Sequence, residues 1–384
     1  MWPFRKKERL SVVLITIGSS SVSGAYAHYE PGQPPTIYYV ATKTIEPREH
    51  EDLTAAMLRT LDEVGKELIE TGAPTLRRET GSGHADGVLI SVAGPWQDTS
   101  VRTQTIQPGK PFTFTRTMLS EIIASGAHVP PERVSFGESV IATILNGYEI
   151  PDPIGKKANR AEVVILSSTL EKKVTEDIRT RVRKLYHTHT INFTAFAPVA
   201  YTVLRDLYPH EKDFLVLDVE ADGTDLAFIK NGLLVDVGTL PQGLGSLFAA
   251  SRTAERMTIE EEAGLARRTS EQPGYLNPDR NARFSARAEA ARDEWLKGLT
   301  DLLKTFAGLH PLPRTLFLLT EPTAREYLKR TLNTQAFHAL WLSDEPLSII
   351  SVTSDQFASK LRTRSTTEVS IFLSILAMYQ QRRG

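Results

Sequence analysis

One succession of elements occurs twice along this chain of 384 residues, and the recurrence limits the folds open to it. Val12–Ile17 is a continuous β-branched and aliphatic run that enters a glycine–serine turn, and Phe214–Val219 is a second apolar run that enters a polar turn. Runs of this length indicate strands buried on both faces. The pattern indicates an internal duplication, although any two-domain α/β protein would contain similar buried strands.

The first half continues with a strand at 37–40 and a helix over Glu51–Glu70. Its apolar residues are spaced three or four apart and form one stripe. We expect Gly72 and Pro74 to end this helix, because proline removes a hydrogen-bond donor and glycine favours helix ends. Leu76–Asp86 is polar and contains glycine, so it is predicted to be a surface loop.

From about residue 97 to 161 the pattern of apolar and polar residues changes. Alternating stretches surround a predicted helix at 117–125, which indicates a small inserted α+β module. Residues 162–167 then resume a buried strand, which we assign to the same unit as the first strand. A charged helix is predicted at 171–186.

The second half contains a strong hairpin signal, Asn231-Gly232, between the apolar stretches 226–229 and 233–237. Thr258 and Glu261 have the spacing of a capping box and predict a helix over 258–268. A long helix is predicted at 286–308, followed by strand, helix and strand patterns and a final helix over 367–381.

Composition excludes several classes of function. The net charge of −1 argues against a nucleic-acid partner, and the absence of cysteine excludes disulfides and thiolate metal sites. The nine histidines form no pair with the spacing of a zinc site, and no Gly-x-Ser-x-Gly elbow is present. No apolar run approaches the roughly 18 residues that span a bilayer.

The N-terminus allows two interpretations. A basic start, a short apolar run and Ala25-Tyr26-Ala27 resemble a signal peptide over residues 1–27, with a mature chain beginning at His28. The alternative, which we favour, is a buried first strand preceded by a basic and aromatic segment, Met1–Arg9, that could make a weak membrane contact.

Residues 15–22 resemble the first phosphate loop, "DIGSSSVK", of the bacterial actin-like proteins FtsA and PilM. Residues 217–226 lie where that superfamily has its second phosphate loop, and 315–324 where it has its adenosine motif. The matching segments run from about Ser11 to Gln381. The inserted module is similar to the extra subdomain of the FtsA and PilM branch, of which the chain is identified as a member by this resemblance.

The resemblance implies an α/β fold, a duplicated actin-like (RNase H-like) two-lobed fold with an inserted small α+β subdomain. The implied division is 1–96 and 162–205 for the first lobe, 97–161 for the insert, 206–366 for the second lobe with a short helical subdomain at about 245–308, and 367–384 for a closing helix packed on the first lobe.

It also implies a nucleotide site, with ATP and Mg²⁺ as possible cofactors. The matching residues are Gly18, Ser19, Ser20, Ser21, Asp218, Gly223, Thr224, Asp225 and Gly243. No catalytic residue and no metal ligand is predicted with them.

Several positions depart from the superfamily pattern. Thr16 stands where the family has a Mg²⁺-binding aspartate, and Glu220, Ala221 and Asp222 replace three glycines of the second loop. Phosphate loops use glycine because backbone N–H groups must approach the anion closely. Each added like-charge contact would cost on the order of 4 kcal/mol at an effective dielectric near 20. Glu321 and Pro322 likewise replace glycines of the adenosine motif and add bulk where the base would bind. From these departures together we expect no bound cofactor and little or no ATP turnover.

The leading hypothesis is a scaffold, not an enzyme, that recruits or assembles a bacterial division or type IV pilus machine. It would lie at the cytoplasmic face of the membrane, bind protein partners and be able to self-associate into filaments. The alternative is an active ATPase or small-molecule kinase of the same fold, which would need the missing carboxylate and open glycines.

Overall fold

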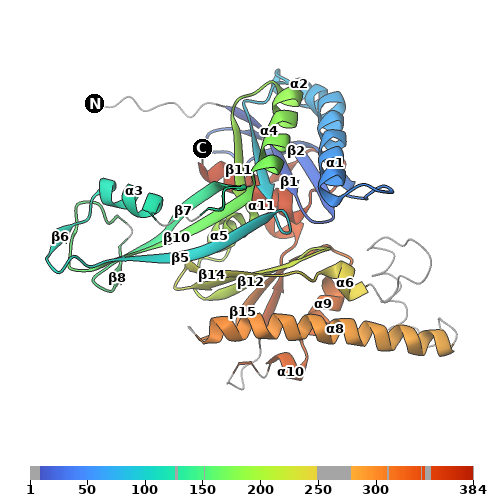
Figure 1. Ribbon diagram of the computed structural model, residues 1–384. Helices are drawn as coiled ribbons and strands as arrows, with labels where there is room; N and C mark the ends of the chain where they lie inside the picture. Colours follow the sequence, from blue (N-terminus) through green and yellow to red (C-terminus); the bar gives the residue numbers. More distant parts are fainter. Residues whose placement is uncertain are drawn as a thin grey trace.

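The computed structural model describes residues 9–125, 129–150, 152–248, 278–308, 311–338, 340–341 and 347–383. Two sheets, each covered by helices, form two lobes, and a long narrow insert projects from the first lobe (Figure 1). Within the described residues, no helix is both long enough and apolar enough to cross a membrane.

The first lobe is built on a six-stranded sheet of order β11-β4-β1-β2-β3-β17. Its strands are β1 (Leu10–Ile17), β2 (Ser21–Tyr29), β3 (Thr36–Thr44), β4 (Gly87–Val92), β11 (Ile191–Ala195) and β17 (Arg362–Thr363). β1, β2 and β3 form an antiparallel meander, whereas β4 and β11 continue from β1 in parallel. The first predicted strand is therefore a central strand, as its continuous apolar run indicates.

The second lobe repeats this arrangement in a sheet of order β14-β13-β12-β15-β16. Its strands are β12 (Phe214–Val219), β13 (Thr224–Lys230), β14 (Leu233–Leu240), β15 (Thr315–Thr320) and β16 (Ser348–Ser351). Again three strands form an antiparallel meander and two continue from the first strand in parallel. The matching strand orders confirm the predicted duplication. The predicted Asn231-Gly232 turn joins β13 to β14, with both residues at positive φ.

The helix predicted to end at Gly72 continues beyond it. α1 (Leu53–Glu67) passes through a π-helical turn, η1 (Leu68–Gly72), into α2 (Ala73–Thr80). Pro74 lies in the first turn of α2, where its missing N–H costs least. The prediction of a loop over Leu76–Asp86 was therefore wrong in its first part: Leu76 is fully buried, and the helix ends at Gly81, whose φ is 83°.

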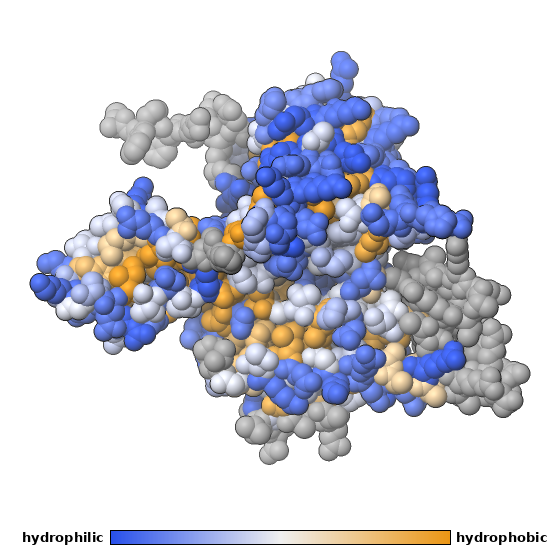
Figure 2. All heavy atoms as spheres, in the orientation of Figure 1, coloured by the Kyte–Doolittle hydropathy of each residue, from blue (hydrophilic) through white to orange (hydrophobic). Residues whose placement is uncertain are grey.

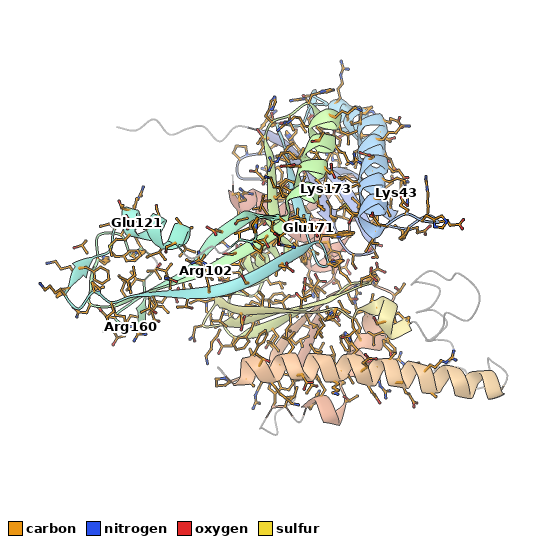
Figure 3. All side chains as sticks on the ribbon, viewed as in Figure 1. Lys43, Arg102, Glu121, Arg160, Glu171 and Lys173 are labelled. Atoms are coloured by element: carbon orange, nitrogen blue, oxygen red, sulfur yellow. The ribbon has the colours of Figure 1, made fainter. Side chains whose placement is uncertain are left out.

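The insert has its own sheet of order β5-β10-β7-β8, with β5 (Gln97–Ile106), β7 (Arg133–Leu145), β8 (Tyr148–Glu149) and β10 (Ala161–Glu171). α3 (Arg116–Ser125) and the pair β6 (Phe112–Thr113) and β9 (Lys157–Ala158) close its outer end. Figure 3 places the labelled Arg102 and Arg160 along this arm and Glu171 near its junction with the first lobe. Our sequence-based division assigned residues 162–171 to the first lobe, whereas β10 pairs with β5 and β7 on its two sides.

Helices cover the outer face of each sheet. α4 (Lys172–Tyr186) packs with α1 on the first lobe, in the core that contains Met57 and Ile178. On the second lobe lie α6 (Leu244–Phe248), α8 (Pro278–Ala307), α9 (Arg325–Leu332) and α10 (Gln335–His338), around Trp295 and Leu303. The helix predicted at 258–268 lies outside the described residues.

A third core joins the two sheets. α5 (Phe196–Leu207) and α11 (Ile371–Arg383) lie between them and share one apolar cluster with residues of β1 and β12. α11 also contacts β1 and β2 of the first lobe. Apolar side chains gather along the insert and over the second sheet, while the face around α1 and α4 is mostly hydrophilic (Figure 2).

Candidate functional site

A cavity with a volume of about 460 Å³, the interlobe cavity, lies between the two lobes. It is lined by the carboxyl ends of β1, β4, β12 and β15, by the segment after β16, which includes the 3₁₀ turn η3 (Ser354–Phe357), and by the start of α11. Ligands of open α/β sheets bind in such crevices outside the carboxyl ends of strands. This cavity is the candidate functional site.

The turn between β1 and β2 is the first loop. The N–H of Gly18 donates to the carbonyl of Ser21 at 3.0 Å, and the indole of Trp96 donates to the carbonyl of Gly18 at 2.8 Å. Ser19 is 1% exposed, whereas Ser20 and Ser21 line the cavity. The loop is therefore held from two sides and directs hydroxyls into the cavity.

The turn between β12 and β13 is the second loop. Its Glu220 N–H donates to the Gly223 carbonyl at 3.0 Å, and the Thr224 hydroxyl donates to the Gln242 carbonyl at 2.7 Å. The indole of Trp295 donates in turn to the Thr224 hydroxyl at 2.9 Å. A Cβ on Gly243 would lie 2.1 Å from the Glu220 carbonyl oxygen. Only glycine fits there, since the N-terminal end of α6 packs directly on the loop backbone.

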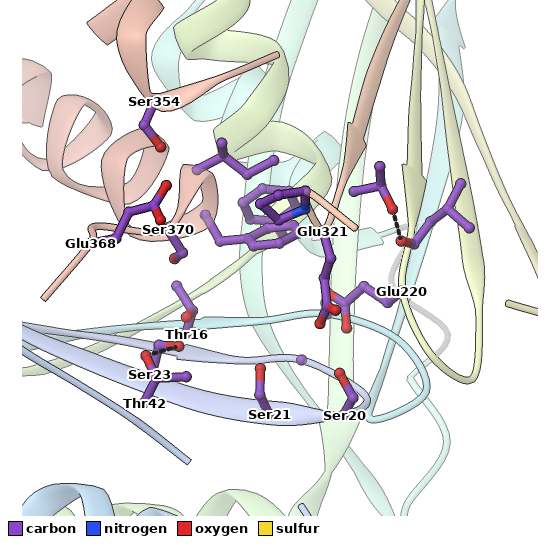
Figure 4. Close-up of a pocket in the computed structure, with 18 of the residues that line it drawn as sticks. Thr16, Ser20, Ser21, Ser23, Thr42, Glu220, Glu321, Ser354, Glu368 and Ser370 are labelled. Carbon is purple, nitrogen blue, oxygen red and sulfur yellow. Dashed lines mark hydrogen bonds between the residues drawn. The ribbon is translucent and has the colours of Figure 1, made fainter. Parts of the chain in front are cut away.

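The two loops meet through the side chain of Glu220. Its carboxylate accepts the N–H of Ser19 at 2.5 Å, and the Ser19 hydroxyl accepts the N–H of Asp222 at 3.0 Å. A Cβ on Gly18 would lie 2.5 Å from the same carboxylate. A carboxylate of the chain itself therefore binds the backbone amide that the resemblance assigns to a phosphate. Figure 4 shows Glu220 beside Glu321, with Ser20 and Ser21 below them.

Three acidic groups in the second loop and the strands beside it have raised pKa values. The pKa of Glu220 is raised to about 7, mainly by burial and to a smaller extent by Asp225 and Glu321, against the lowering effect of its hydrogen bond from the Ser19 amide. Burial likewise raises the pKa of Asp218 well above its usual range, with added repulsion from Glu220 and Asp225. Burial also raises the pKa of Asp225, although the Thr239 hydroxyl opposes the change. These groups carry less negative charge at neutral pH than their number indicates.

The structure brings together only part of the predicted site. Gly18, Ser20 and Ser21 line the interlobe cavity, and the backbone N–H of Ser19 contacts Glu220. Asp218 and Asp225 line a separate small cavity of about 10 Å³ behind the loop, where both carboxylate oxygens of Asp218 lack a hydrogen-bond partner among the described residues.

The remaining predicted residues shape the second loop. Gly223, Thr224 and Gly243 make the backbone and hydroxyl contacts described above and do not line the interlobe cavity.

Sequence reasoning missed the far wall of the cavity. Ser91 at the end of β4, the residues after β16 and the residues before α11 all line it. Figure 4 places Ser354, Glu368 and Ser370 opposite Glu321. β16 runs parallel to β15, so the segments that follow both strands lie at one edge of the sheet. That rule could have identified Ser354 once the two strands were assigned as neighbours.

A Mg²⁺-nucleotide does not fit the residues present. Its phosphates would have to displace Glu220 from the Ser19 amide and would then lie against Glu220 and Glu321. Thr16, which lines the cavity, supplies a hydroxyl where the metal would need a carboxylate. Among the residues that the structure describes, no three histidine or acidic side chains are grouped so as to hold a metal ion.

The fold is that of the actin-like ATPases. The solved structure of a PilM-PilN type IV pilus biogenesis complex matches with a TM-score of 0.62 and 14% identity, over 97% of this chain and 99% of that one. A Bacteroides thetaiotaomicron protein with an actin-like ATPase fold matches with a TM-score of 0.43 and 10% identity, over 92% and 94%. EutJ, an ethanolamine utilization protein of Carboxydothermus hydrogenoformans, matches with 0.42 and 10%, over 97% and 89%.

No protein-family profile and no curated protein sequence matches the chain. At these identities the likeness concerns the fold, and it agrees with the resemblance of the loop segments to the actin-like superfamily.

Proposed function

We propose that this chain is an actin-like scaffold that recruits a protein partner into a larger assembly, with ATP turnover weak or absent. The observation that carries the proposal is the hydrogen bond from the Ser19 N–H to the Glu220 carboxylate. An enzyme that transfers phosphoryl groups needs free amides and cations around the phosphates. Here the amide has an internal carboxylate partner, and Glu220 lies beside Glu321. The two lobes of the fold are present, but the Glu220 carboxylate occupies the place where a phosphate would bind.

A groove on the first lobe offers a place for a partner. It has a volume of about 470 Å³ and is lined by residues of β7, α4, β11 and α11. Within the described residues β11 pairs only with β4, so its other edge, near β7, has no strand partner there. Exposed strand edges bind extended peptides by adding a strand.

The chemistry of the groove favours an acidic, partly apolar peptide. Lys172, Arg179 and Arg383 line it with one carboxylate, Glu176. The Arg179 guanidinium lies 5.2 Å from the ring centroid of Phe193 in the groove wall. Arginine held over an aromatic ring is pre-oriented to bind a carboxylate while the ring packs against apolar groups.

Assembly of a type IV pilus is the function that we favour over cell division, because the matching structure with the TM-score of 0.62 is a PilM-PilN pilus biogenesis complex. The partner of this chain would then be a PilN-type protein. The proposal includes a location at the cytoplasmic membrane face, with a weak contact through Met1–Arg9. Residues 1–8 of that segment lie outside the described residues. Sedimentation with anionic liposomes, with and without residues 1–9, tests the contact, and equal pelleting of both forms would exclude it.

The first test concerns ATP. We expect no thermal stabilisation of the purified chain by ATP–Mg²⁺ and no measurable hydrolysis. A variant with glycine at 220, 221 and 222 and Thr16→Asp restores the superfamily pattern in the two phosphate loops and should bind nucleotide more tightly than the parent. Saturable stabilisation of the parent at micromolar ATP–Mg²⁺ would support the ATPase or kinase alternative instead.

The second test concerns the partner. A PilN-type protein encoded in the same genome should bind the full chain, and Arg179→Glu should weaken that binding about tenfold or more, because it reverses a charge in the groove. Arg183→Glu is the matched control, since Arg183 is an exposed residue of the same helix that does not line the groove. Absence of binding, or an equal loss in both variants, would contradict the proposed role of the groove.

A further inference from the structure

The cavity between the lobes is acidic. Four carboxyl groups line it, those of Glu220, Glu321, Asp355 and Glu368, against the single guanidinium of Arg325. Focused negative potential in a cleft with apolar walls attracts cations and repels polyanions. The negative potential of the cavity therefore disfavours a nucleotide and favours a positively charged ligand.

The carboxyl groups are spread over opposite sides of the cavity. Glu321 is close enough to Glu220 to contribute to its raised pKa, while Glu368 lies across the cavity in Figure 4. Within the described residues they form no compact group that could hold a metal ion. This separation suits a ligand whose positive charges are also separated.

The wall between these groups combines apolar side chains with hydroxyl groups. Phe196, Ile371 and Phe372 line the cavity beside several serine and threonine residues. Ser91 is 2% exposed, and its hydroxyl has no hydrogen-bond partner among the described residues. Ser91 pairs with Thr16 across β4 and β1, so both side chains lie on the cavity face of the sheet. A buried hydroxyl without a partner is costly unless a ligand or water satisfies it.

From these features we propose that the cavity binds a linear aliphatic polyamine. The terminal ammonium groups, which are hydrogen-bond donors only, bind the carboxylates at the two sides, and the hydroxyl oxygen of Ser91 accepts a further N–H. The methylene chain packs against Phe196, Ile371 and Phe372. A volume of about 460 Å³ falls within the usual range for small-molecule sites. The ligand does not involve the β11 groove, so this proposal is independent of partner binding.

The test is a calorimetric titration of the full chain with spermidine at physiological ionic strength. Parallel titrations use putrescine, Mg²⁺ and ATP–Mg²⁺. We expect saturable binding of spermidine, weaker binding of the shorter putrescine with its two charges, and no comparable signal from Mg²⁺. ATP–Mg²⁺ should not compete.

Variants then locate the site. Glu368→Gln removes an exposed carboxylate at one side of the cavity with little risk to folding, and Glu321→Gln removes one at the other side. Each should weaken spermidine binding about tenfold. Glu326→Gln is the matched control, because Glu326 is exposed on α9 and does not line the cavity. It should leave binding unchanged.

Three results would overturn the proposal. One is the absence of saturable spermidine binding up to millimolar concentration. Another is an equal weakening by Glu326→Gln, which would indicate nonspecific attraction to an acidic surface. The third is an equivalent response to Mg²⁺.

Discussion

The two loops of the cavity hold the same position in the duplicated fold, yet they differ in what they contribute. The first loop keeps small residues, Gly18 to Ser21, and presents a backbone amide. The second has Glu220, Ala221 and Asp222 where the loop that it resembles has glycines, and its Glu220 carboxylate binds that amide. A side chain of the second loop is thus the hydrogen-bond partner of the first loop's backbone. The sheets beneath the two loops nevertheless have the same strand order.

The two loops also differ in how closely other atoms pack around their glycines. A Cβ on Gly18 would meet the far end of the Glu220 side chain, which can move aside. A Cβ on Gly243 would meet backbone oxygens of Glu220 and Ala221, at 2.1 and 2.7 Å. The first loop should therefore tolerate alanine much better than the second.

Gly243→Ala should have the largest effect. We expect a loss of about 3 kcal/mol or more in the free energy of unfolding, because the second loop and the start of α6 must separate. Chemical denaturation measures this loss. Gly223→Ala is the control within the same loop, since a Cβ there would lie 3.5 Å from its nearest neighbour, the Leu240 carbonyl oxygen. Similar losses in both variants would contradict the difference in packing.

Glu220→Gln should have an intermediate effect that depends on pH. The pKa of Glu220 is about 7 in the folded chain, against an ordinary value of 4.5. Between these pH values the folded chain holds a proton that the unfolded chain has released, so the free energy of unfolding falls as pH rises through this window. Glutamine removes this dependence and keeps an acceptor for the Ser19 amide. It should stabilise the chain by on the order of 2 kcal/mol above about pH 7.

Denaturation of both forms between about pH 5 and pH 8 checks this result. Asp218 and Asp225 also have raised pKa values, so some slope of the same sign should persist in the variant. A parent chain that becomes more stable as pH rises through the window would contradict the assigned state of Glu220.

Gly18→Ala should have the smallest effect, about 1 kcal/mol, because it displaces the Glu220 carboxylate and leaves the Ser19 amide without its partner. The loss should shrink in a Glu220→Ala background, where the obstructing carboxylate is absent. A double-mutant cycle measures this coupling. Additive effects would show that the two loops do not interact through Glu220.

Local patterns in the sequence predicted much of the fold. The apolar runs at 12–17 and 214–219 identified the two central strands, and Asn231-Gly232 identified the hairpin, because each signal depends on neighbouring residues only. The continuation of α1 past Gly72 was missed, since burial of Leu76 against the first lobe outweighs the breaking tendency of Gly72 and Pro74. β10 was assigned to the first lobe because an apolar run does not indicate which strands it will pair with.

The site was less predictable than the fold. Adverse charge at Glu220 was foreseen, but its bond to Ser19 was not, because the two residues are 201 positions apart in the chain. The roles of Glu368 and Ser91 also depend on which segments meet at the cavity. Such long-range neighbours become visible only when the chain order of the strands is known.

The two indole contacts make tryptophan fluorescence a reporter of the cavity. Trp96 donates to the first loop and Trp295 to the second, and both rings are more than nine-tenths buried. The fluorescence of each ring depends on its hydrogen bond and its surroundings. Variants with phenylalanine at one or the other position would assign the signal. Occupancy of the cavity could then be followed separately from each lobe, in unlabelled protein and in real time.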